Sequence, residues 1–152
     1  MRIADVMNKE VAESSPSEHA AIAWDKMRSH HIHHLVVLEG TQVVGVLSER
    51  DLHALDPKDR AEKTVRDLMD SNPVTVEPQT TLRDAANLLR GNGIGCLPVM
   101  EGDRLVGIVT TTDLLEQFGR GFPQHGAGGR SRAGRGPKKG SEGRTPPPRG
   151  MR

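Results

Sequence analysis

The sequence has very few of the residues that build disulfide frameworks, aromatic cores or membrane spans. Among 152 residues there is one cysteine, Cys96, so no intramolecular disulfide can form, which fits a reducing cytoplasm. Tyrosine is absent and the aromatic residues are Trp24, Phe118 and Phe122, so the core must consist mainly of Val, Leu, Ile, Met and Ala. No run of about 18 apolar residues occurs, and residues 1–5 do not open an apolar signal segment. We therefore expect a cytoplasmic protein without membrane association.

Charge is unevenly distributed along the chain, although the formal net charge is only +1. Residues 119–152 contain nine Lys and Arg against one Glu, with ten of the 17 glycines and five of the ten prolines. Residues 1–118 contain twelve basic and 19 acidic side chains. A segment so poor in apolar side chains cannot bury enough surface to offset its chain entropy. We therefore predict that residues 119–152 form a disordered basic tail.

The first 118 residues contain an internal repeat. A shift of 62 positions aligns residues 3–56 with 65–118 without a gap, and turn glycines, apolar positions and an acidic residue recur in step. The most similar stretches have eight residues, Gly45–Leu52 and Gly107–Leu114. This regularity indicates one supersecondary unit used twice, as repeat 1 (residues 1–56) and repeat 2 (65–118), with a polar linker at 57–64.

Each repeat has the pattern of an extended segment, a helix, two strands and a second helix. In repeat 1 the expected ranges are 11–14, 17–29, 35–38 and 43–47, with the last helix opening at Ser48 and closed by Asp56-Pro57. In repeat 2 they are 74–76, 80–90, 97–100 and 105–109, with the last helix opening at Thr110. The order β-α-β-β-α, found twice, is an α+β arrangement. Neither repeat has much of a core alone, so we expect the two to pack as a pseudo-twofold pair.

The eight-residue motif places a hydroxyl residue three positions before an aspartate, Ser48 with Asp51 and Thr110 with Asp113. The preceding apolar run indicates a buried strand that leads into a helix N-terminus, whose unpaired N–H groups and dipole favour an anion. The hydroxyl group can donate to a phosphate oxygen, and the aspartate can accept two hydroxyl protons from a ribose diol. The same pattern is also a helix capping box. Its double occurrence at one spacing favours a ligand site over capping alone.

The two repeats together resemble a tandem pair of cystathionine-β-synthase (CBS) domains, often called a Bateman module. Residues 65–69, 73–76, 95–99 and 107–114 carry the resemblance, and repeat 1 has weaker counterparts. The resemblance implies a regulatory module, not an enzyme, that binds AMP, ADP, ATP or S-adenosylmethionine in clefts between the repeats and signals by a conformational shift. It implies no required cofactor. It also implies a homodimer and an unidentified regulated protein partner.

Carried over to this sequence, the resemblance assigns Ser48 and Asp51 to one cleft, and Thr110 and Asp113 to the other. In each cleft the aspartate would hold the ribose and the hydroxyl residue would face a phosphate. Adenine would be held by backbone near Val11 and Ala12 or near Val74 and Thr75, and by apolar side chains near Ile32 and Ile94. Arg50 has two interpretations, a phosphate contact or a solvated residue of the first helical turn. The negative charge of residues 1–118 argues against tight binding of a polyanion such as ATP at low salt.

Two alternatives belong to other functional classes. The His30–His34 cluster suggests a metal-responsive homodimer, because imidazoles suit Zn, Ni or Cu. However, successive side chains of a strand point to opposite faces, so one ion cannot easily collect four of them, and we predict neither a metal site nor a catalytic group. The basic tail suggests association with nucleic acid through phosphates, but it lacks aromatics that stack on bases. Glycine-rich residues 91–95 follow a helix, which indicates a helix C-cap and not a nucleotide loop.

Overall fold

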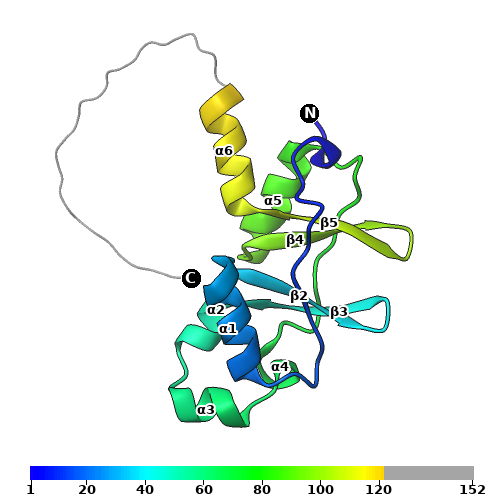
Figure 1. The fold of residues 1–152 in the computed structure, drawn as a ribbon. Coiled ribbons are helices and arrows are strands. Elements are labelled where there is room, and N and C mark those ends of the chain that lie inside the picture. The colour runs from blue at the N-terminus through cyan, green and yellow to red at the C-terminus, as the bar shows by residue number, and fades with distance from the viewer. Residues whose placement is uncertain (122–152) are drawn as a thin grey trace, which may run out of the picture. The chain divides into compact units, whose positions relative to one another are not determined.

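The computed structural model describes residues 1–121, which form an α+β arrangement of short strands and helices (Figure 1). The first elements are η1 (Ile3–Asp5), β1 (Glu13–Ser14), α1 (Ala20–His30), β2 (His34–Glu39), β3 (Gln42–Ser48) and α2 (Glu49–His53). They are followed by α3 (Pro57–Glu62), α4 (Val65–Leu68), α5 (Leu82–Asn92), β4 (Cys96–Glu101), β5 (Arg104–Thr110) and α6 (Thr111–Gly121). The predicted fold class is confirmed. Within residues 1–121, none of the helices has the length and apolar character needed to cross a membrane.

Two predicted segments look different in the structure. Residues 74–76 do not form a strand, because only Val76 pairs with β4, through a parallel bridge to Val99. Residues 119–121 belong to α6, and the remainder of the predicted tail lies outside the described residues. The interpretation of the tail as a nucleic-acid contact falls on the same residues.

The hairpins β2–β3 and β4–β5 are the repeated framework of the fold. Leu35 pairs with Leu47, and at the 62-residue shift Leu97 pairs with Val109. Both hairpins turn at a glycine with positive φ, 65° at Gly40 and 64° at Gly102, a conformation that costs glycine no steric strain. β1 adds a parallel strand to β2.

Alternate residues of β2 face two different cores, as expected for a strand buried on both sides. Leu35 and Val37 pack with Met27 of α1 and other residues of repeat 1. Val36, between them, packs with Cys96 of β4 and Ile108 of β5. This second cluster joins the repeats.

The two repeats exchange their leading segments. Asn8 forms a bridge with Ile108 of β5, and Asp70 forms a bridge with Val46 of β3. Asp70 lies 62 positions after Asn8, and Ile108 lies 62 positions after Val46. The two contacts are therefore reciprocal, as a pseudo-twofold pair requires. In Figure 1 the chain between η1 and β1 accordingly runs past both hairpins.

This exchange also explains why the first helix of each repeat begins later than predicted. α1 begins at Ala20 and not at residue 17, because the backbone before it is paired with the chain around residue 65. The N–H of Val65 donates to the carbonyl of Glu18 at 2.8 Å. In repeat 2 the N–H of Ile3 donates to the carbonyl of Thr80 at 2.8 Å, and α5 begins at residue 82.

The predicted linker at residues 57–64 contains helix α3. Asp56 caps this helix by accepting the N–H of Asp59 at 2.9 Å, and Pro57 occupies the first turn, where its missing N–H has no cost. Arg60 donates to the carbonyl of Leu52 at 3.2 Å, and its guanidinium stacks over the ring of Trp24 at 4.5 Å. α2 already ends at His53, before the Asp56-Pro57 pair that we interpreted as its end, and this pair starts the next helix instead.

Candidate functional site

A cavity of about 340 Å³ lies beside the first turn of α2, and we call it the first cleft. Its walls come from both repeats. Five predicted site residues line it, namely Ser48, Arg50, Asp51, Val74 and Ile94. The structure thus brings a hydroxyl group, a carboxylate and a guanidinium of repeat 1 together with two apolar side chains of repeat 2.

Ser48 and Asp51 form a capping box at the start of α2. The backbone N–H and the hydroxyl group of Ser48 both donate to Asp51 Oδ2, at 2.9 and 3.0 Å. The N–H of Asp51 donates to Ser48 Oγ at 3.3 Å. These contacts engage one carboxylate oxygen, and a carboxylate can accept hydrogen bonds on both of its oxygens. The capping interpretation therefore describes this structure, and it holds the carboxylate at the wall of the first cleft.

Thr110 and Asp113 repeat this geometry in repeat 2. The N–H of Thr110 donates to Asp113 Oδ2 at 2.9 Å, and the N–H of Asp113 donates to Thr110 Oγ1 at 3.1 Å. Neither residue lines a cavity described here. The predicted adenine-contacting residues of repeat 1 do not line these cavities either. They pack against the hydrophobic clusters, and they are Val11, Ala12 and Ile32. The structure does not gather the predicted residues of a second cleft into one described cavity.

Several charged and polar residues of the first cleft are not among the predicted site residues. Glu49 and Asp70 add two carboxylates to its lining. His33 and His34 also line it, and His33 Nδ1 lies 2.5 Å from Glu49 Oε1. Burial, assisted by the neighbouring His33, lowers the pKa of His34 from its usual value of 6.5. In the sequence, these histidines suggest metal ligands and give no sign that they line a cleft.

Two glycines shape the wall contributed by repeat 2. Gly93 ends α5 with φ of 63°, which confirms the predicted helix C-cap. At Gly95 a Cβ atom would lie 2.8 Å from Nε2 of His34, so a larger residue there would displace the imidazole. Both glycines line the first cleft.

The histidine cluster does not converge on a metal. His30 Nδ1 contacts the carbonyl of Lys26 at 3.1 Å, and His31 is the left-handed C-cap of α1 with φ of 54°. Across residues 1–121, no group of three or more His, Cys, Asp and Glu side chains is placed to hold a metal ion. A metal site at this cluster would therefore need ligands from outside residues 1–121 or from a second copy.

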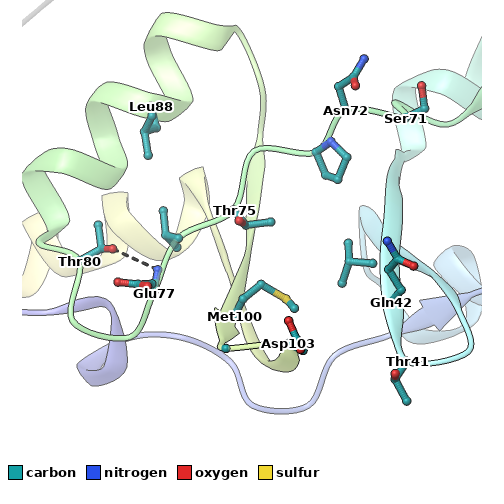
Figure 2. A pocket seen from close by; sticks show the side chains of 14 residues that line it. Thr41, Gln42, Ser71, Asn72, Thr75, Glu77, Thr80, Leu88, Met100 and Asp103 are labelled. Carbon is teal, nitrogen blue, oxygen red and sulfur yellow. Dashed lines mark hydrogen bonds between the residues drawn. The ribbon is translucent and has the colours of Figure 1, made fainter.

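A second, more open cavity of about 1140 Å³ lies on the other side of the extended segment at residues 73–75. Figure 2 shows Thr75 and Met100 of repeat 2 on one side of it and Gln42 of repeat 1 on the other. Pro73 lines both cavities, whereas Val74 lines the first cleft and Thr75 the larger cavity, because successive side chains of an extended chain alternate. Thr75, a predicted adenine contact, therefore does not line the first cleft.

The model of the CBS domain matches residues 3–56 and 65–120. The chain belongs to the CBS domain family. It is 30% identical over 114 residues to the CBS domain-containing protein YhcV of Bacillus subtilis, covering 74% of this chain and 81% of YhcV. It is 33% identical over 119 residues to the uncharacterized protein MK0525 of Methanopyrus kandleri, covering 75% of this chain and 61% of that protein. It spans only 26% of an inosine-5'-monophosphate dehydrogenase of Korarchaeum cryptofilum, at 31% identity over 127 residues and 83% of this chain.

Solved structures of CBS proteins have the same fold as this CBS protein. CBSX2, solved in complex with AMP, is 30% identical, with a TM-score of 0.68 over 78% of this chain and 98% of that chain. The CBS domain pair of protein MJ0100, solved with 5'-methylthioadenosine and S-adenosyl-L-methionine, is 24% identical. Its TM-score is 0.72 over 78% of this chain and 96% of that chain. The predicted tandem CBS architecture is confirmed.

Proposed function

We propose that this CBS protein is a regulatory module that senses an adenosyl compound bound in the first cleft. The observation that carries the proposal is the pairing of Ser48 and Asp51 of repeat 1 with Val74 and Ile94 of repeat 2 around one cavity. A carboxylate suits a sugar diol, and apolar side chains suit the faces of a purine. The complex of the similar protein CBSX2 with AMP supports this class of ligand.

The size of the first cleft suits a nucleoside. Its volume of about 340 Å³ is at the lower end of the range of ligand pockets, about 300–1,000 Å³. Adenine would lie between Val74 and Ile94, and the ribose would meet the carboxylate of Asp51. Arg50 would contact a group attached to the 5' carbon.

We infer a binding role and not a catalytic one. Cys96 and His34 both line the first cleft and suggest a nucleophile with its base. However, burial raises the pKa of the Cys96 thiol to about 12, and a thiol that stays protonated is a poor nucleophile.

The signal would be a shift between arrangements of the two repeats. A ligand in the first cleft touches both repeats, so its binding free energy depends on how they are placed relative to each other. The ligand therefore favours one arrangement, and a partner protein that distinguishes the arrangements reads the signal. We also propose a homodimer, which light scattering on the purified protein tests directly.

Calorimetric titration with adenosine tests the site. Asp51→Ala should weaken adenosine binding by roughly ten- to a hundredfold, because it removes a charge-assisted hydrogen bond to the ribose. Asp113→Ala is the corresponding test for a second cleft. Asp67→Ala is the matched control, since Asp67 caps α4 in the same way but does not line the first cleft, and it should leave affinity unchanged. Wild-type affinity in Asp51→Ala would show that the site assignment is wrong.

A further inference from the structure

The charges around the first cleft discriminate among adenosyl compounds, and this inference rests on the function proposed above. Three carboxylates line the cleft, those of Glu49, Asp51 and Asp70, against the guanidinium of Arg50. Each carboxylate is already engaged by the protein in a different way. Glu49 contacts His33 at 2.5 Å, Asp51 accepts from Ser48, and Asp70 Oδ1 accepts the N–H of Asn72 at 3.0 Å.

We propose that the first cleft selects neutral or cationic adenosyl compounds, such as 5'-thioethers and 5'-sulfonium derivatives of adenosine, over adenine nucleotides. In a cavity of about 340 Å³, ligand and wall charges lie closer together than a Debye length, about 10 Å at 0.1 M salt. A phosphate group brings further negative charge into this acidic lining, and like charges at such separations repel. A sulfonium or ammonium group is attracted by the same lining.

The internal repeat shows which of these charges belong to the shared scaffold. At a shift of 62 positions, Asp51 corresponds to Asp113, so the ribose-binding candidate occurs in both repeats. Glu49 corresponds to Thr111 instead, and Asp70 corresponds to Asn8. The two additional carboxylates are therefore not required by the fold, because the equivalent positions, Thr111 in repeat 2 and Asn8 in repeat 1, do without them.

The equivalence between Asp70 and Asn8 extends to their hydrogen bonds. Asn8 Oδ1 accepts the N–H of Glu10 at 2.9 Å, and Asp70 Oδ1 likewise accepts the N–H of Asn72 at 3.0 Å. The backbone of each residue bridges to the adjacent strand of the other repeat. Asp70→Asn therefore removes one charge from the first cleft and keeps every described contact of residue 70. Glu49→Gln removes the second charge and keeps an oxygen that can accept from His33.

The test is a calorimetric titration of the full-length protein with 5'-methylthioadenosine, S-adenosylmethionine, AMP and ATP. Wild type should bind the first two more tightly than AMP and ATP. The double variant Glu49→Gln/Asp70→Asn should gain at least about fivefold in affinity for AMP, from two like charges removed at close range. Its affinity for neutral 5'-methylthioadenosine should stay within about twofold of wild type, because that ligand carries no charge. Raising the salt concentration should reduce the difference between wild type and variant.

Three outcomes would overturn the inference. Tighter binding of AMP or ATP than of 5'-methylthioadenosine by wild type would contradict the selection itself. An unchanged affinity of the double variant for AMP would show that Glu49 and Asp70 are not its cause. If no adenosyl compound binds wild type, adenosine included, the proposed function fails and this inference with it, whereas the first two outcomes leave the adenosyl site in place.

Discussion

The sulfur of Met69 lies directly against Gly45, the glycine that opens the motif of repeat 1. A Cβ atom at position 45 would lie 2.6 Å from Met69 Sδ and 2.8 Å from the carbonyl oxygen of Asp70. Gly107 has the same relationship to Met7, at 2.8 Å. Both glycines therefore allow the segment exchanged from the other repeat to lie against the strand.

We predict that Gly45→Ala destabilises the protein by about 1–3 kcal/mol, the usual cost of overpacking. Gly107→Ala should cost less, because the nearest backbone atom, the carbonyl oxygen of Asn8, lies at 3.1 Å. Gly91→Ala is the control, since a Cβ atom there meets nothing within 4 Å and α5 should gain about 0.5–1 kcal/mol. Urea unfolding measures all three. Equal unfolding midpoints for wild type and Gly45→Ala would contradict the close packing.

Capping and ligand binding by the motif of repeat 1 can be separated by two variants. Without ligand, Ser48→Ala and Asp51→Ala should each lower the free energy of unfolding by about 0.5–2 kcal/mol, because each removes part of the capping box of α2. Only Asp51→Ala should strongly weaken binding of adenosine, which has a ribose but no phosphate. Equal losses of affinity in the two variants would indicate that an ordered helix terminus, and not the carboxylate itself, is what the ligand needs.

His34 makes stability depend on pH. Its pKa is lowered by burial in the folded state and returns to about 6.5 on unfolding, so the unfolded chain binds more protons between the two values. This contribution to stability is complete above about pH 6.5 and is lost as the pH falls through the lowered pKa. Unfolding in urea between about pH 7 and pH 5 should therefore show a steeper loss in wild type than in His34→Gln. Equal slopes in wild type and His34→Gln would contradict this prediction.

Cys96 should report on the integrity of the first cleft. Its thiol is buried, with a pKa raised to about 12, and the thiolate is the form that reacts with disulfide reagents. We expect very slow reaction of the native protein with Ellman's reagent and fast reaction in denaturant. Adenosine should slow the native reaction further by stabilising the folded state. Because Cys96 is the single cysteine, the whole absorbance change comes from its thiol. Prompt reaction of one thiol in the native protein would be incompatible with this burial.

The sequence predicts the hairpin strands better than the helix ends, because the signals for these strands lie within the strand segments themselves. The apolar pattern and the turn at Gly40 indicate a strand at residues 43–47, and β3 spans Gln42–Ser48. By contrast, α1 begins late because the backbone of residues 16–19 pairs with residues 64–66, where the linker joins the other repeat. A local pattern contains no information about such a partner. The start of α3 at Asp56-Pro57 did have a readable signal, because an aspartate before a proline is also a helix start.

The candidate site could be predicted in part because some of its residues occur in both repeats. Asp51 belongs to the motif that both repeats share, the family resemblance implies Ile94, and both residues line the first cleft. Glu49 and Asp70 could not be predicted in this way, because the two repeats differ at these positions. Those differences carry the charge that separates one ligand from another, and only the fold places residue 70 beside repeat 1.

The exchanged leading segments have a consequence for how the protein can be divided. The chain around Asn8 completes the hairpin β4–β5, and the chain around Asp70 completes β2–β3. Cutting the gene between the two sequence copies would therefore separate each hairpin from the piece that closes its edge. Neither fragment would contain a complete domain, and the two repeats should unfold together in a single cooperative transition.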